Sequence, residues 1–211
     1  ASVNVWECSV RNNGYLQKLI GRKINYTFKE DHDPVLYRTK YLNQMIRSTQ
    51  TPFVAIWDTD VIAPVKQVTD SVKLLRDGQV DFVYPYDSRF LDTSDIIRNI
   101  YLDTGDISIL ETNFRRMKSM YTPNPVGGAF FCNLQSYMNS GLENEKFYGW
   151  GVEDGERFIR WKNLGYKIQR IEGILYHLTH PRGLNSCVHH PSQSIIKYRE
   201  LRASHRLISE K

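Results

Sequence analysis

A short apolar run in the first third of the chain constrains the fold most. Phe53 to Trp57 is almost continuously apolar, as is typical of a strand buried on both faces of a parallel sheet. Before it, Pro34 opens an amphipathic segment that predicts a helix to about Thr49. After it, Pro64 opens another helix to about Leu75, and Val80 to Tyr84 predicts a further strand. This alternation predicts an α/β fold with a mostly parallel central sheet flanked by helices.

The remaining elements follow from alternation and from helical spacing. Further strands are expected at Val3–Cys8, Lys23–Phe28, Ala129–Cys132 and Tyr166–Tyr176, and further helices at Ile96–Tyr101, Ile107–Met117 and from Pro191 to about Ile208. No linker or repeat divides the 211 residues, so a single domain is expected.

Composition excludes several classes of protein. Apolar residues make up 41% of the chain and charged residues 24%, which is typical of a soluble globular protein, and no apolar run approaches the roughly 20 residues of a membrane span. Three widely spaced cysteines favour a reducing, cytoplasmic compartment. The net charge of +5 is scattered, with a denser C-terminal end, so no nucleic-acid partner is expected. The basic residues of this end are expected mainly to form solvated surface. Attraction to nucleotide phosphates or to an anionic membrane face is a secondary role for them.

An acidic pair, Asp58 and Asp60, follows the central apolar run. Because side chains alternate along a strand, both carboxylates are expected on one face, at the sheet edge where α/β proteins bind ligands. Two close carboxylates repel each other unless a cation lies near them, and oxygen ligands suit Mg²⁺ or Mn²⁺. The pair therefore predicts a metal that carries a diphosphate.

A second candidate metal-ligating motif follows the last long strand. His177 and His180 stand three residues apart, with Pro181, Arg182 and Gly183 directly after them. Either histidine alone reads as an ordinary loop residue, but together with Asp60 they form the mixed carboxylate and imidazole set that Mn²⁺ accepts. Arg182 is placed to reach a phosphate.

The third motif is Trp150-Gly151-Val152-Glu153-Asp154, which leads into a predicted helix ending near Gly165. Acidic residues in a first helical turn can simply complement the helix dipole. An aromatic residue between glycines instead favours a lid that closes on a ligand, with a carboxylate meeting that ligand. The spacing of four from Glu153 to Arg157 and from Glu156 to Arg160 predicts surface ion pairs.

Together these motifs resemble inverting glycosyltransferases of the β-1,4-galactosyltransferase type, including bacterial enzymes that build polysaccharides. The resemblance runs from about Asp33 to Arg182, with the motifs in the family's order. It adds two further segments, Arg38-Thr39-Lys40-Tyr41-Leu42-Asn43 and Gly127-Gly128. It implies a GT-A fold with a nucleotide-sugar half at residues 1–90 and an acceptor and catalytic half at residues 91–211.

The resemblance also implies roles for individual residues. Asp154 matches the catalytic base, and Asp60 and His180 match the metal ligands. His177 stands where animal members have Met, and Asp58 is expected to contact ribose or metal-bound groups. The expected donor site comprises Arg38, Asp58, Asp60, Gly128, Trp150 and Arg182, and the expected acceptor site comprises Trp150, Gly151, Glu153 and Asp154. Gly155 departs from a second Asp found in some members.

The implied reaction is metal-dependent transfer of a hexose or N-acetylhexosamine from a UDP-sugar. Its acceptor would be a saccharide or a lipid-linked saccharide, in surface polysaccharide synthesis at the inner face of the membrane, with Mn²⁺ or Mg²⁺ as cofactor. The family's first strand and nucleotide-gripping loop have no match before Val3, which suggests a fragment. Two alternatives remain open: a nucleotide- or sugar-binding module without activity, and a metal-dependent phosphoesterase, which usually needs two metals.

Overall fold

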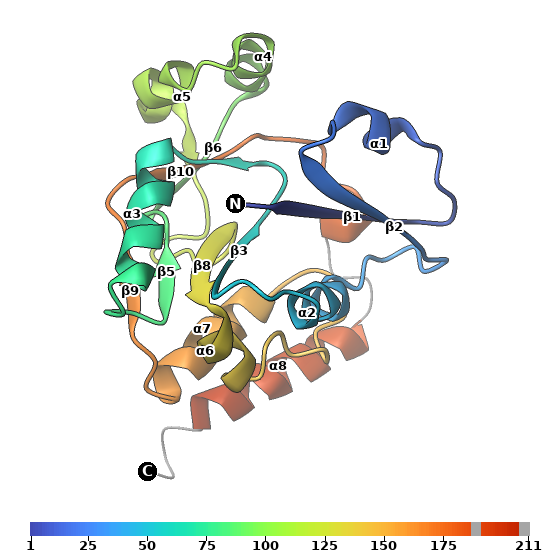
Figure 1. Ribbon diagram of the computed structural model, residues 1–211, viewed down its shortest axis with the longest axis vertical. Coiled ribbons are helices and arrows are strands. Elements are labelled where there is room, and N and C mark those ends of the chain that lie inside the picture. Colours follow the sequence, from blue (N-terminus) through green and yellow to red (C-terminus); the bar gives the residue numbers. More distant parts are fainter. Residues whose placement is uncertain (187–190, 207–211) are drawn as a thin grey trace.

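The computed structural model describes residues 1–186 and 191–206. Its largest sheet has the strand order β3-β8-β5-β9, formed by Phe53–Trp57, Ala129–Asn133, Phe82–Tyr84 and Ile168–Arg170 (Figure 1). A second sheet has the order β4-β10-β6-β7, formed by Val61–Ile62, Ile174–His177, Arg89–Asp92 and Lys118–Ser119. The first two strands, β1 (Val3–Ser9) and β2 (Ile24–Glu30), pair in parallel as a separate ribbon that includes the short helix α1 (Tyr15–Leu19) between them.

Side-chain alternation along the main sheet divides the core between its two faces. Phe82 and Phe130 lie on the face covered by α2 (Arg38–Arg47), α6 (Leu134–Asn139) and α7 (Glu153–Asn163), where Phe82 stacks on Trp161 at 3.7 Å between ring centroids. Val83 and Phe131 face α3 (Val65–Arg76) on the other side. The helix α8 (Pro191–Arg206) packs on α7 (Figure 1).

The second sheet has its own apolar layer. Leu91, Ile174 and Tyr176 pack with Ile97 and Leu110. Those two residues come from α4 (Asp95–Thr104) and α5 (Ser108–Asn113), which lead through a 3₁₀ turn, η1 (Phe114–Arg116), into β7. A second 3₁₀ turn, η2, spans Leu184–Ser186. The predicted α/β class and the helices in this region are confirmed.

The expectation of a mostly parallel sheet is wrong in detail. Among the described residues, three strand pairings are parallel (β1–β2, β6–β10, β5–β9) and four are antiparallel. The strand β8 runs antiparallel to both β3 and β5, because it enters the sheet after a long excursion through the second sheet rather than through a single crossover helix. An apolar run predicts that a strand is buried, but it does not predict the direction in which the strand runs.

Two other boundaries also differ from expectation. The strand predicted from Tyr166 to Tyr176 is two strands in different sheets, separated at Gly173, whose φ is 141°. The Gln67 side chain occupies the space that a Cβ at Gly173 would need, and donates to the carbonyl oxygens of Pro85 (2.5 Å) and Ile174 (3.1 Å).

The helix predicted from Pro34 begins only at Arg38. The preceding turn is held by side chains instead: Asp33 accepts from the Val35 amide, and Asn185 accepts from the Leu36 amide. At the other end of the chain, α8 is described to Arg206, so the expected end near Ile208 lies outside the described residues.

Candidate active site

The pairing of two short strands brings the predicted metal ligands together. Val61 is the antiparallel partner of His177, and the Leu178 amide donates to the Asp60 carbonyl oxygen at 2.8 Å. This register places an Asp60 Oδ2 atom 3.5 Å from His177 Nε2 and 3.1 Å from His180 Nε2. The three side chains can therefore each offer one ligand atom to a single ion, the arrangement predicted from the sequence.

The outer contacts of both histidines fit a metal site. Nδ1 of His177 lies 2.8 Å from an Asp92 carboxylate oxygen, and Nδ1 of His180 lies 2.9 Å from the Pro181 carbonyl oxygen. Each contact fixes the ring and leaves Nε2 directed at Asp60, as outer-shell partners do in metalloproteins. The hydrogen bond between Asp60 and His177 raises the pKa of His177 and lowers that of Asp60. One carboxylate and two imidazoles suit Mn²⁺, so these residues fit the implied cofactor.

Asp58 is directed away from this cluster. Its carboxylate accepts a hydrogen bond from Arg38 Nη2 at 2.7 Å, and its amide donates to the Gly128 carbonyl oxygen at 2.8 Å. Burial raises the pKa of Asp58, and the charges of Asp154 and Asp60 add to that effect, while Arg38 opposes it. A cation is expected beside this acidic pair. The cation that lies next to Asp58 is the Arg38 guanidinium.

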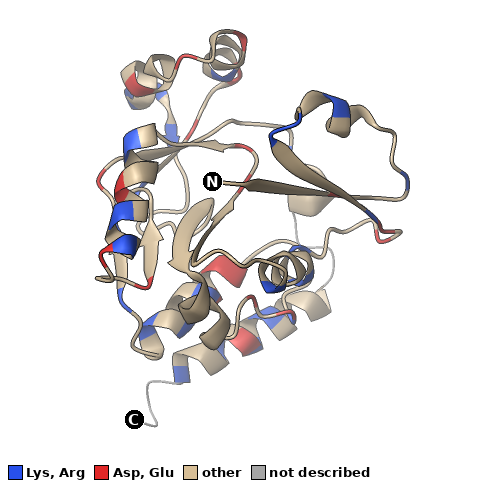
Figure 2. Ribbon diagram, viewed as in Figure 1, with Lys and Arg blue, Asp and Glu red and all other residues tan. Residues whose placement is uncertain are grey.

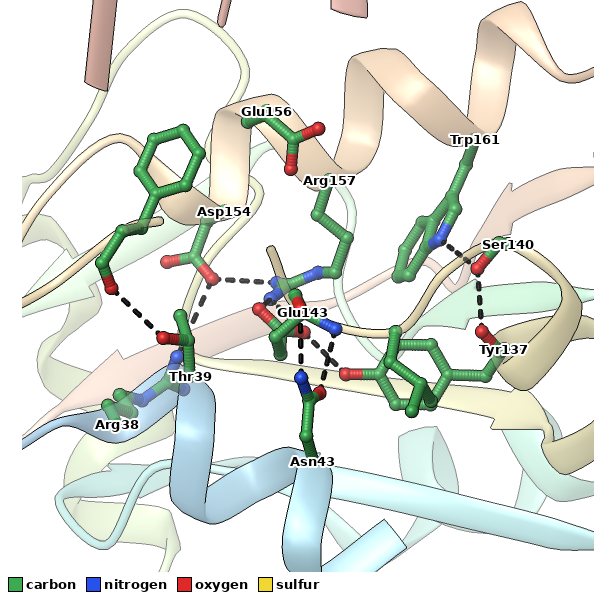
Figure 3. A network of polar contacts seen from close by, with 12 residues as sticks. Arg38, Thr39, Asn43, Tyr137, Ser140, Glu143, Asp154, Glu156, Arg157 and Trp161 are labelled. Atoms are coloured by element: carbon green, nitrogen blue, oxygen red, sulfur yellow. Dashed lines mark hydrogen bonds and ion pairs between the residues drawn. The ribbon is translucent and has the colours of Figure 1, made fainter. Parts of the chain in front are cut away.

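Asp154 lies in the first turn of α7 and is held by a buried arginine (Figure 3). Arg157 Nη2 donates to Asp154 Oδ1 at 2.6 Å, and Arg157 Nη1 lies 2.9 Å from both carboxylate oxygens of Glu143. The Arg157 and Glu143 side chains are each 1% exposed, and the guanidinium also lies 4.4 Å from the Phe130 ring centroid. On the other side of Asp154, Arg38 Nη1 lies 4.0 Å from the same Oδ1 atom.

The second oxygen of Asp154 lies against the glycine pair. A Cβ atom at Gly127 would be 2.6 Å from Asp154 Oδ2, so any side chain there would displace the carboxylate. At Gly128 φ is 81°, and a Cβ would press on Leu175 and Phe90. The two glycines therefore let Asp154 and the core side chains of the sheet approach the backbone closely. Asp154 Oδ1 accepts a hydrogen bond from Arg157, and its Oδ2 accepts none from the residues that the structure describes.

Trp150 stands in a loop with unusual backbone geometry. Gly149, Gly151 and Val152 all have positive φ, at 67°, 106° and 69°. The Trp150 side chain is partly exposed, and the Arg182 guanidinium lies 5.9 Å from its ring centroid. The buried Lys197 of α8 donates to the Trp150 carbonyl oxygen at 2.5 Å. The predicted lid residue and phosphate-binding residue are thus neighbours, and the loop is anchored to the last described helix.

Glu153, expected to contact the acceptor, is buried at 8% exposure. Burial, and then the nearby charge of Asp154, raise its pKa to about 7. Its Oε2 atom has no hydrogen-bond partner among the residues that the structure describes. The predicted surface ion pair between Glu153 and Arg157 is wrong, because Arg157 turns into the core to Asp154 and Glu143. The pair between Glu156 and Arg160 forms at 2.9 Å, but Glu156 is buried rather than on the surface.

Sequence reasoning missed four residues of this site. Arg157 and Glu143 carry the buried ion pair, Asp92 orients His177, and Lys197 anchors the lid loop. The spacing of Asp154 and Arg157, three residues on a helix, was an available signal for one contact. The others join segments at least 14 residues apart and follow only from the fold.

Comparisons with known proteins agree with this geometry. A family model described as the N-terminal domain of galactosyltransferase matches residues 104–182, the stretch that contains Asp154, His177 and His180. No curated protein matches the sequence. The catalytic domain of Drosophila β1,4-galactosyltransferase 7, in complex with xylobiose, superposes with a TM-score of 0.53 at 12% identity, covering 94% of this chain and 80% of that one.

Two further solved structures have the same architecture. S. aureus TarS 1–349 in complex with UDP-GlcNAc matches with a TM-score of 0.57 at 10% identity, over 99% of this chain and 62% of that one. A mannosyltransferase from Pyrobaculum calidifontis, in complex with GDP-Man and Mn²⁺, matches with a TM-score of 0.53 at 16% identity, over 98% of this chain and 60% of that one. The fold is that of a GT-A glycosyltransferase. The fold class predicted from the sequence is confirmed, and the family-model match over residues 104–182 agrees with the predicted recognition and enzyme class.

In the part of the chain that the structure describes, no helix is both long and apolar enough to cross a membrane. Over the residues coloured in Figure 2, lysine and arginine are spread over several elements and form no single stripe.

Proposed function

We propose that this single domain transfers a hexose or N-acetylhexosamine from a UDP-sugar to a saccharide acceptor, with inversion at the anomeric carbon. The observation that carries the proposal is the link that Arg38 makes between the two halves of the site. Arg38 contacts Asp58 beside the metal-ligand cluster, and it faces Asp154 at the start of α7. The same guanidinium therefore lies next to both the sheet edge proposed to bind the donor and the candidate base, Asp154.

The donor would bind at the sheet edge. Asp60, His177 and His180 would hold Mn²⁺, or Mg²⁺ in its place, and such an ion supplies charge neutralisation for a departing diphosphate. Arg182 and Trp150, which lie together, would close over that diphosphate. Arg38 and Asp58 would position the nucleoside, next to the Gly128 backbone, whose carbonyl oxygen accepts a hydrogen bond from the Asp58 amide. A mutant of the Drosophila enzyme is solved with manganese, UDP-Gal and xylobiose, which supports this choice of ligands.

The acceptor would be activated by Asp154. Its Oδ2 atom would take the proton of the acceptor hydroxyl as that oxygen attacks the anomeric carbon, while Arg157 holds Oδ1 in place. The breaking bond joins the anomeric carbon to the donor phosphate oxygen, and the nucleoside diphosphate leaves with the electron pair. Gly151, Glu153 and Trp150 would form the acceptor side of the closed loop, which excludes water that would otherwise hydrolyse the donor.

The wider role we propose is surface polysaccharide synthesis in the cytoplasm, at the inner membrane face, on a saccharide or lipid-linked saccharide. The described cysteines Cys8 and Cys132 are both free, which supports a reducing compartment, while Cys187 lies outside the described residues. Against a phosphoesterase, the described residues contain one candidate cluster of three metal ligands, whereas a phosphoesterase usually needs two metals.

The test compares the wild type with Asp154→Asn in transfer from a panel of UDP-sugars to a panel of saccharides. Asp154→Asn should fold, because Oδ1 can still accept from Arg157, and should lose transfer by about 10²–10⁴-fold. Donor binding should persist in this variant. Near-normal turnover in Asp154→Asn would exclude Asp154 as the base, and donor binding without transfer by the wild type would favour a binding module.

A further inference from the structure

A pocket of about 220 Å³ lies beside the metal-ligand cluster of Asp60, His177 and His180, and apart from Arg182 its lining residues have no role in the proposal above. It is lined by Asp92, Lys118, Ser119, Met120, Tyr121 and Arg182. Asp92 connects it to the cluster, since its carboxylate meets His177 Nδ1 at 2.8 Å. We refer to it as the Lys118 pocket.

The charges of the Lys118 pocket are unbalanced. Lys118 and Arg182 bring two positive charges, and neither has an ion-pair partner among the described residues. Asp92, the one carboxylate in the lining, is directed to His177. Arg115 and Arg116, exposed and without ion pairs in the described part of the chain, precede Lys118, with Met117 in between. The pocket therefore offers surplus positive charge, and a bound divalent ion next to it would add more.

An aromatic surface forms another wall of the pocket. Tyr121 is 51% exposed and has a φ of 51°, an uncommon backbone conformation for a side chain of this size. Its ring centroid lies 6.0 Å from that of Phe90, which in turn lies 6.2 Å from the His177 ring. The Met120 amide, which donates to the Phe90 carbonyl oxygen at 2.8 Å, ties this segment to β6. An exposed aromatic face next to unpaired cations suits a ligand with both an apolar ring face and a negative charge.

We infer that the Lys118 pocket binds a negatively charged group on the acceptor, next to the sugar that receives the transferred residue. This inference rests on the proposed function, because it takes the saccharide at Asp154 to be the acceptor. The sugar would lie against Tyr121, and its phosphate or carboxylate would lie between Lys118 and Arg182. The same chemistry serves a saccharide joined to a carrier through phosphate and one that contains a uronic acid.

The test is binding of the Mn²⁺- and UDP-loaded protein to an array of matched neutral, phosphate-bearing and uronic-acid-bearing saccharides. The wild type should prefer charged members by about tenfold, and Lys118→Glu should abolish that preference. The control is Lys73→Glu, the same charge change at an exposed lysine of α3 outside the pocket, which should keep the preference. A preference for phosphate alone or for carboxylate alone identifies the source of the charge.

The inference is overturned by equal binding of neutral and charged saccharides, or by an undiminished preference in Lys118→Glu. Absence of all saccharide binding does so as well. Calorimetric titration with UDP separates this failure from failure of the proposed function. Lys118→Glu should bind UDP and Mn²⁺ like the wild type, whereas a wild type that binds no UDP contradicts the proposed donor site itself.

Discussion

The buried contact between Arg157 and Glu143 makes a prediction about both stability and activity. Arg157→Met keeps most of the side-chain volume and removes the charge. It leaves the Glu143 carboxylate, whose side chain is 1% exposed, with the Tyr137 hydroxyl as its one remaining hydrogen-bond donor among the described residues. It also removes the hydrogen bond of 2.6 Å to Asp154 Oδ1. The substitution therefore acts on the core and on the candidate base at once.

The size of the stability loss follows from the geometry. Two hydrogen bonds of 2.9 Å join the charges, and both groups are removed from water. Breaking such a buried pair from one side costs about 3–5 kcal/mol, because the remaining charge stays buried without compensation. Total unfolding free energies of domains are roughly 5–15 kcal/mol, so Arg157→Met should lose a large part of its stability. Arg157→Met combined with Glu143→Leu removes both charges of this pair and should recover most of the loss.

Urea unfolding measures the free energies, and sugar transfer measures the function. The double variant should be close to the wild type in stability but should remain slow in transfer, because Asp154 has lost the group that orients it. A single variant that loses less than about 1 kcal/mol would contradict the reasoning. So would a double variant with full transfer activity, since Arg157 would then have no part in positioning Asp154.

Two further predictions concern Asp154 and Glu153, which both lie in the first turn of α7. Gly127→Ala should fold but lose most transfer activity with unchanged UDP affinity, because its methyl group would press on Asp154 Oδ2; unaltered kcat would contradict this. Glu153 has a folded-state pKa raised to about 7, above its unfolded value near 4.5, so wild-type stability should fall as pH rises between those values. Glu153→Gln should remove that loss of stability with pH. Its melting temperature should exceed that of the wild type at pH 8 but not at pH 4. Equal melting temperatures at pH 8 would refute this prediction.

Much of the donor side could be predicted from the sequence because its residues lie next to strong local signals. Asp60 follows an apolar strand directly, and His177 and His180 follow another. The ends of strands in such folds meet at one edge. The structure brings the ligand atoms of these three side chains close together, and their binding of a metal remains a prediction. The roles of Arg38, Gly128 and Trp150 in binding remain predictions.

The parts that could not be predicted depend on long-range packing. Arg157 has the sequence context of a surface residue, and only the approach of the 140–145 segment to α7 makes it the partner of Glu143. Asp92 is an ordinary strand-end residue until β6 pairs with β10 and brings it to His177. Strand direction failed for a similar reason, since burial and alternation carry no information about which way β8 runs.

The central claim is that Asp60, His177 and His180 hold the metal that binds the donor diphosphate. The most direct test is calorimetric titration of UDP with and without Mn²⁺, on the wild type and on Asp60→Ala. The claim predicts that the wild type binds UDP tightly only when Mn²⁺ is present, and that Asp60→Ala loses this dependence while remaining folded. UDP binding by the wild type that is independent of Mn²⁺, or Mn²⁺-dependent binding that survives in Asp60→Ala, would contradict it.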